Sequence, residues 1–157
     1  AAELQASGVQ RFKLHLGQGV DRDLATFDAV ADAVPDASIA LDAHGVYDIS
    51  AAVRLGRGLD ERTAWFFESP IAADDVAGHA ELAAAIDTPV AAGEALRHRF
   101  EAADWISRRS ADILQPDIGR TGITEGMAIG TLANAAYRPV MPHQSAALGP
   151  AVAASLH

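Results

Sequence analysis

Acidic side chains recur along the chain at nearly constant intervals, each at the end of a short apolar run. Glu68 follows Asp42 by 26 residues, and Glu94 follows Glu68 by another 26. Three carboxylates from neighbouring segments cannot all stay ionised close together without a compensating cation. Because carboxylate oxygens are hard ligands, these residues predict a site for Mg²⁺, with Mn²⁺ as the alternative. The alternative for any single acid is that it caps the following helix.

The interval continues to two further ionisable residues. Asp117 follows Glu94 by 23 residues, and His143 follows Asp117 by 26. Each of these side chains therefore stands at the same position in its own repeat of about 25 residues. For Asp117 alone, a helix cap is the competing interpretation.

Two polar pairs have a spacing of two residues. Asp42 and His44 lie in the stretch SIALDAHGVYD, residues 38–48, and would point to the same side of an extended chain. Lys13 and His15 alternate with apolar neighbours, so they would share one face of a strand while the apolar side chains form the other. The pattern predicts that both pairs reach one site.

The elements that must position these side chains are short apolar runs separated by longer segments of helical hydrophobic spacing. Each run is bounded by Gly, Pro, Asp or Ser. Six strands that alternate with helices predict parallel βα units, and the expected strands are 10–16, 38–42, 64–68, 89–94, 112–117 and 138–143. Ionisable groups at the end of every run favour a parallel (β/α) barrel of the TIM type, whose catalytic residues gather at the carboxyl ends of the strands. In an open doubly wound sheet, only groups near the switch point would converge.

Composition excludes several classes of protein. The 157 residues are 50% hydrophobic and 21% charged, which predicts one soluble globular unit over residues 1–157. The absence of cysteine excludes disulfides, thiolate metal sites and cysteine nucleophiles. A formal charge of −9 argues against nucleic acid or an anionic membrane as a partner. No apolar run approaches the ~20 residues of a membrane span and no signal-peptide pattern is seen, so we expect a cytoplasmic location.

Five motifs together resemble the enolase superfamily, in its mandelate racemase and muconate lactonising branch. They are Asp42 at its strand end, Glu68 in FFESP, Glu94 in AAGEAL, Asp117 in ILQPDIGRTGIT and His143 in MPHQSAALGPAVAASLH. The likeness is closest to acid-sugar dehydratases of the galactonate dehydratase type, which have Asp-x-His after the third barrel strand, QPD at the sixth and a PH…LGP…A…LH pattern around the seventh. One departure is a single glycine in residues 121–124, where the family usually has two.

The resemblance implies an incomplete barrel and a reaction. Residues 1–157 would be about six βα units, strands two to seven of the carboxyl-terminal barrel domain, without the capping domain. The implied activity is a Mg²⁺-dependent hydro-lyase that removes water from a sugar acid, an aldonate, to give a 2-keto-3-deoxy sugar acid. Asp42, Glu68 and Glu94 would bind the metal.

The resemblance also implies the roles of the remaining residues. His143 would be the general base that removes the proton α to the carboxylate, with Asp117 as its partner. His44 would be the acid that protonates the departing hydroxyl. Lys13 and His15 would bind the substrate, although Lys13 could instead only balance the carboxylates.

Two alternatives stay open. A racemase or epimerase on the same fold would use His15 and His143 from opposite faces of the substrate. An inactive barrel fragment would catalyse nothing without the rest of the barrel. We expect the full-length protein to be a homo-oligomer that takes a small-molecule sugar acid and neither nucleic acid nor membrane.

Overall fold

Parallel strands and helices alternate along most of the chain. The computed structural model describes residues 1–145 and 148–157. The helices are α1 (Ala2–Ala6), α2 (Val20–Ala33), α3 (Ile49–Asp60), α4 (Val76–Ala85), α5 (Arg99–Arg108), α6 (Ile118–Ala135) and α7 (Gly149–Leu156). The strands are β1 (Arg11–His15), β2 (Ser38–Asp42), β3 (Phe67–Glu68), β4 (Val90–Ala92) and β5 (Ile113–Leu114).

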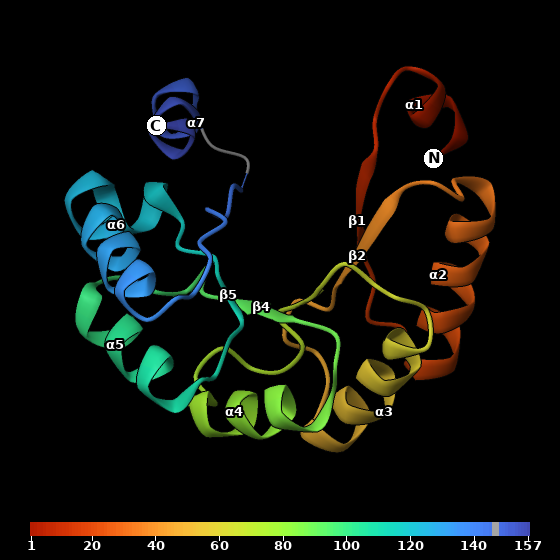
Figure 1. Ribbon diagram of the computed structural model, residues 1–157, viewed down its shortest axis with the longest axis horizontal. Coiled ribbons are helices and arrows are strands. Elements are labelled where there is room, and N and C mark those ends of the chain that lie inside the picture. Colours follow the sequence, from red (N-terminus) through yellow and green to blue (C-terminus); the bar gives the residue numbers. More distant parts are fainter. Residues whose placement is uncertain (146–147) are drawn as a thin grey trace.

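The five strands form one parallel sheet in the order β1-β2-β3-β4-β5. Figure 1 shows the sheet as an open arc, with the helices α2 to α6 on its outer side and with α1 and α7 on either side of the opening. The predicted parallel βα architecture is confirmed. The arc corresponds to part of a barrel wall, as the incomplete barrel predicted from the sequence requires.

The sixth expected strand, residues 138–143, is not a regular strand. It meets the end of β5 through two isolated parallel bridges, Leu114 with Val140 and Asp117 with His143. Pro139 and Pro142 interrupt this segment, and proline has no N–H group to donate to a ladder. The position predicted for this segment is therefore confirmed, whereas the prediction of a continuous strand is wrong.

The core between strands and helices explains the alternation seen in the sequence. Phe12 and Leu14 of β1 pack with Leu41, Phe67 and the buried side chains of α2, α3 and α4. A second cluster joins β4 and β5 to α5 and α6, around Trp105. The apolar face of β1 is thus turned to the helices, as predicted, and its polar face is turned inward.

The inner side of the arc carries its own small apolar cluster. Ala40, Ala91 and Ile113 of β2, β4 and β5 are buried together there with Phe66, which directly precedes β3. Since alternate residues of a strand face the same side, the residue two positions later points to the same interior, nearer the carboxyl end. Asp42, Glu68 and Gln115 occupy these inward positions. The alternation of side chains along the strands therefore places three polar side chains at one rim.

Helix α6 contains a break. Gly122 has φ 71° and ψ 167° inside the range Ile118–Ala135. Glycine adopts this positive φ without the steric penalty that a side chain would bring. None of the helices described is long and apolar enough to cross a membrane.

Candidate active site

Two carboxylates at the ends of neighbouring strands are buried. Asp42 of β2 is 2% exposed and Glu68 of β3 is 1% exposed. The Lys13 Nζ atom lies 2.7 Å from Glu68 Oε1 and 3.3 Å from Asp42 Oδ2. Burial lowers the pKa of Lys13, but hydrogen bonding and charge from Glu68 and Asp42 raise it by more, to above its ordinary value. Lys13 is therefore the cation that compensates this pair.

His15 lies beside the same carboxylate. Its Nδ1 atom is 3.3 Å from Asp42 Oδ2, and its side chain is 67% exposed. Lys13 and His15 thus share the inward face of β1, as predicted. Both are placed where they can contact a ligand that approaches Asp42.

Gln115 completes the surroundings of Glu68, although its position in the sequence predicted no role for it. The Gln115 Nε2 atom donates to Glu68 Oε2 over 3.0 Å, and the residue is 4% exposed. The Gln115 Oε1 atom is buried and has no hydrogen-bond partner among the described residues. A buried, unused carbonyl oxygen on a residue that contacts a carboxylate is an additional hard oxygen donor. The signal for it was present in the QPD motif.

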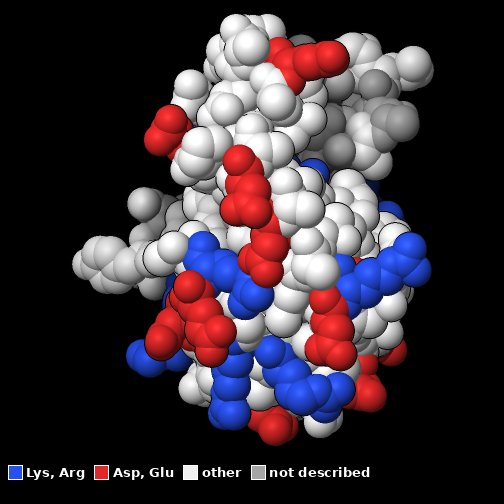
Figure 2. All heavy atoms as spheres, turned by 90° about the vertical axis from the view of Figure 1, so that its right-hand side faces the viewer, with Lys and Arg blue, Asp and Glu red and all other residues white. Residues whose placement is uncertain are grey.

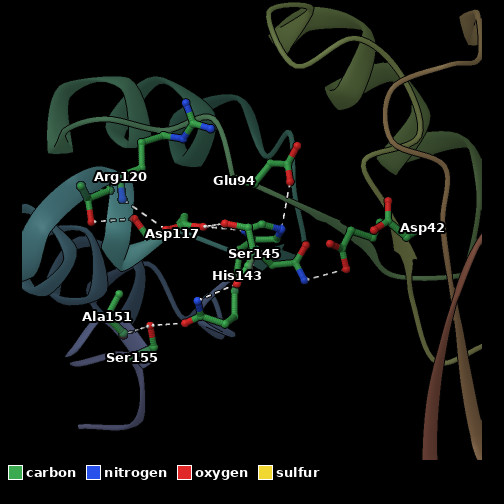
Figure 3. Close-up of polar contacts among 12 residues, drawn as sticks. Asp42, Glu94, Asp117, Arg120, His143, Ser145, Ala151 and Ser155 are labelled. Atoms are coloured by element: carbon green, nitrogen blue, oxygen red, sulfur yellow. Dashed lines mark hydrogen bonds and ion pairs between the residues drawn. The ribbon is translucent and has the colours of Figure 1, made fainter. Parts of the chain in front are cut away.

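His143 lies between two acidic side chains, as Figure 3 shows. Its Nδ1 atom is 2.8 Å from Asp117 Oδ2, and its Nε2 atom is 3.0 Å from Glu94 Oε2. Each ring nitrogen thus faces a carboxylate. Once Glu94 no longer contacts Nε2, the contact with Asp117 favours the tautomer with a proton on Nδ1, which leaves Nε2 as the reactive nitrogen. The predicted contact between Asp117 and His143 is present.

Asp117 combines this contact with a structural one. Its Oδ1 atom accepts from the Arg120 N–H group over 3.2 Å, which caps α6. Burial raises the pKa of Asp117, but the hydrogen bonds from His143 and from the Arg120 backbone outweigh it and hold the pKa below its usual range. The two interpretations of Asp117, helix cap and histidine partner, therefore both hold.

The local conformation at His44 differs from the expectation. β2 ends at Asp42, and His44 and Gly45 have φ values of 51° and 75°. The Val46 N–H group donates to the Ala43 carbonyl over 3.2 Å, which closes a turn with positive φ at both central residues. The assumption of an extended chain from Asp42 to His44 is wrong, because the His-Gly pair favours this turn. His44 stays at the rim and is exposed, and its N–H group donates to Asp42 Oδ1 over 3.0 Å.

The three predicted metal ligands are divided between two partners. Asp42 and Glu68 share Lys13, whereas Glu94 contacts His143, and Figure 3 shows Asp42 apart from the group formed by Glu94, His143 and Asp117. Within residues 1–145 and 148–157, no three His, Cys, Asp or Glu side chains converge on one point that could hold a metal ion. The expected convergence is thus not seen in this arrangement. The donor chemistry nevertheless suits a hard cation, because Asp42 and Glu68 end two adjacent strands, Glu94 follows the next strand, and Gln115 Oε1 is unused.

A pocket of about 650 Å³ lies beside this rim, between the loops after β3 and β4 and helix α5. Glu94 lines it, together with largely apolar side chains such as Leu96, Phe100 and Trp105. Asp42, Glu68 and His143 do not line it. The pocket adjoins the candidate site rather than containing it.

Comparison with known proteins places this chain in a family. The family model described as "Enolase C-terminal domain-like" matches residues 1–157. D-galactonate dehydratase of Ralstonia nicotianae is 35% identical over 98% of this chain and 43% of its own length. D-galactarolactone cycloisomerase of Agrobacterium fabrum is 34% identical over 90% of this chain and 38% of its own length. The relatives therefore include more than one type of reaction.

A solved structure shows the same arrangement of the backbone. L-talarate dehydratase from Polaromonas sp. JS666, complexed with Mg and L-glucarate, superposes with a TM-score of 0.89. It is 34% identical, over 99% of this chain and 44% of that protein. The chain spans less than half the length of the curated relatives it matches. It belongs to the enolase superfamily and corresponds to part of the carboxyl-terminal barrel domain of the mandelate racemase and muconate lactonising enzymes.

Proposed function

We propose that this chain supplies the catalytic rim of a Mg²⁺-dependent sugar-acid dehydratase. The observation that carries the proposal is the pairing of His143 with Asp117 at the same rim as the buried carboxylates Asp42 and Glu68. That rim joins a candidate base to residues suited to bind an acidic substrate. The dehydratases among the relatives support the same assignment.

In the proposed reaction, His143 is the base. Asp117 holds the proton on Nδ1, so Nε2 can accept the proton that leaves the carbon α to the substrate carboxylate. Nε2 contacts Glu94 in this structure, and the nitrogen becomes available to a substrate only when Glu94 turns to another partner. The affinity of Glu94 for a different partner therefore controls access to the base.

His44 is the proposed acid at the other side of the site. The electrons of the broken C–H bond form a C=C bond while the β C–O bond breaks. The departing hydroxyl takes a proton from His44 and leaves as water, since hydroxide alone is a poor leaving group. The resulting enol tautomerises to a 2-keto-3-deoxy sugar acid.

Asp42, Glu68 and Glu94 are the proposed ligands of Mg²⁺, with Mn²⁺ as the alternative. A bound divalent cation would neutralise the charge that develops on the substrate carboxylate when its α proton leaves. Lys13 and His15, on the inward face of β1, would bind the same carboxylate or a neighbouring hydroxyl. Lys13 can do so because Glu68 and Asp42 keep it protonated.

A racemase or epimerase is the second candidate. His15 lies at the rim, 3.3 Å from Asp42 and on a different strand from His143. A second base there could return a proton to the opposite face of the α-carbon. This reaction would exchange the α proton with solvent without releasing water from the substrate.

The test is incubation of the chain with Mg²⁺ in D₂O and a panel of hexonates, pentonates and 6-deoxyhexonates, followed by NMR. A dehydratase yields a 2-keto-3-deoxy acid, and a racemase yields only deuterium at the α-carbon. His143→Asn should abolish both signals, whereas His44→Asn should abolish only the keto acid. His157→Asn, a change at the exposed carboxyl terminus, is the matched control. Lack of both signals with every acid would overturn the proposal for this chain.

A further inference from the structure

A buried polar network lies behind the rim, between the loop that follows β1 and the loop that follows β2. Its centre is Asp23, in the first turn of α2, which is fully buried. The Tyr47 hydroxyl donates to Asp23 Oδ2, and the Gln18 N–H group donates to Asp23 Oδ1 over 3.0 Å. The Gly19 N–H group in turn donates to the Tyr47 hydroxyl oxygen over 3.1 Å. Both Asp23 oxygens and the Tyr47 hydroxyl are thus satisfied, which makes such a network rigid.

The two loops that this network joins carry the candidate site. Gln18 and Gly19 come three to four residues after His15, and Tyr47 comes three residues after His44. Figure 1 shows β1 beside β2 and α2 beside α3, and the two loops connect β1 to α2 and β2 to α3. The network therefore connects the segment that follows Lys13 and His15 to the turn that presents His44.

The two loops also touch through apolar groups. A Cβ atom added at Gly17 would lie 2.8 Å from Val46 Cγ2, so only glycine allows this approach. Gly17 also has φ 138°, a backbone conformation that residues with a side chain rarely adopt. The close approach is a second and independent sign that the relative position of the loops is tightly determined.

The other side of the His44 turn is held by the loop after β3. The Gly45 N–H group donates to the Ser69 carbonyl over 2.6 Å, and the Tyr47 N–H group donates to the Pro70 carbonyl over 3.3 Å. Backbone contacts thus hold the turn toward β3, and on the β1 side the hydrogen-bonded support comes from the Tyr47 hydroxyl. Burial and the bond to Asp23 raise the pKa of Tyr47 to about 12, so the hydroxyl keeps its proton near neutral pH.

We propose that Tyr47 and Asp23 are positioning residues, which set the His44 turn relative to Lys13 and His15. The inference rests on the proposed function, because the position of His44 matters only if His44 is the acid of the reaction. Neither residue is one of the proposed reacting groups. Their substitution should affect the proton transfer from His44. It should not affect proton removal by His143, because His143 lies on another segment.

The test compares Tyr47→Phe with Tyr137→Phe. Tyr137 is 96% exposed, so its change removes the same hydroxyl group without affecting a buried contact. We expect Tyr47→Phe to lower kcat for keto-acid formation by about tenfold, with the rate of α-deuterium exchange within about twofold of the unmodified chain. Amide hydrogen exchange should become faster in residues 16–20 and 43–48 and should not change in the control.

Equal losses of keto-acid formation and α-exchange would indicate general destabilisation and overturn the inference, as would unchanged amide exchange in both loops. If the unmodified chain converts no sugar acid, the proposed function fails by itself. Amide hydrogen exchange then shows separately whether the Tyr47 side chain holds the His44 turn in place. Asp23→Asn, which keeps the side-chain size, replaces Tyr47→Phe in all measurements if that variant does not fold.

Discussion

Lys13 is the only lysine in the chain, and its ammonium group lies between two buried carboxylates. Two carboxylates removed from water need positive charge nearby, and Lys13 supplies it here. A divalent cation bound by the same carboxylates would supply more positive charge than Lys13 does. At the scale of single residues, Asp42 and Glu68 can therefore be balanced by Lys13 or by a bound divalent cation, whereas Glu94 contacts His143.

Lys13→Met should therefore make the chain depend on added metal. We expect a loss of about 2 kcal/mol in the free energy of unfolding, since Lys13 is partly exposed and water screens part of the charge. Mg²⁺ should raise the urea midpoint of this variant more than that of the unmodified chain. Arg57→Met, which removes an exposed positive charge on α3, is the control. An equal effect of Mg²⁺ on all three proteins would contradict a metal site at these carboxylates.

At the scale of elements, α6 is a helix that a glycine interrupts near the rim. Asp117 begins this helix and also contacts His143, so the start of α6 positions the proposed base. The positive φ of Gly122 breaks the helix one turn later. The sequence contains this glycine, but its positive φ is seen only in the structure.

Two glycines of α6 allow a matched test of this conformation. No atoms lie within 4 Å of a Cβ added at Gly122 or at Gly130, but only Gly122 has a positive φ. Gly122→Ala should destabilise the chain by about 1 kcal/mol through backbone strain. Gly130→Ala, in a regular part of the helix, should instead stabilise it by about 0.5–1 kcal/mol. Urea unfolding measures both, and a stabilising Gly122→Ala would show that the break is not required.

An ion pair between α5 and α6 should make stability depend on pH. The side chain and the backbone N–H group of Arg99 lower the pKa of Glu125 from 4.5 to about 2. Because the pKa is lower in the folded state, the stabilisation is complete above pH 4.5 and is lost as the pH falls toward 2. Glu125→Gln should therefore remove part of the decrease in the urea midpoint over this range. Glu81→Gln, an exposed change on α4, should leave the decrease unaltered.

At the scale of the whole molecule, the described chain is an arc of parallel strands with helices outside and a polar rim. Figure 2 shows Lys and Arg side chains interspersed with Asp and Glu side chains on one face of the molecule, rather than gathered by sign. The negative net charge is thus spread over that face instead of forming a single acidic patch there. The buried carboxylates at the rim are the charges with the strongest electrostatic consequences, because little water screens them.

The arc should not be equally stable along its length. β2 and β3 lie in its centre, with Leu41, Phe67 and Ala40 fully buried. Residues 138–143 pair with the β5 side only through two isolated bridges. We expect amide hydrogen exchange to be roughly tenfold or more slower in residues 38–43 than in residues 138–145, measured by mass spectrometry. Equal protection would mean that the His143 segment is as firmly held as the central strands.

The sequence by itself determined the order of βα units, the inward face of β1, and that Asp42, Glu68, Glu94, Asp117 and His143 stand at or just after the ends of successive parallel segments. It could do so because alternation in a strand and the polarity of parallel units are local properties of the chain. It also indicated the pairing of Asp117 with His143, because both residues stand at the same phase of successive units. Ala146 and Ala147 of the MPHQSAALGP motif lie outside the described residues.

Only the tertiary structure decided which partner each carboxylate contacts, that Gln115 joins the site, and that Tyr47 reaches Asp23. The partners in these contacts are 24 to 55 residues apart in the chain, and their distances depend on the twist of the sheet and the packing of the loops. The turn at His44 was missed for the same reason. Its conformation combines a local His-Gly preference with backbone bonds from the loop after β3, and the second of these exists only once the strands have paired.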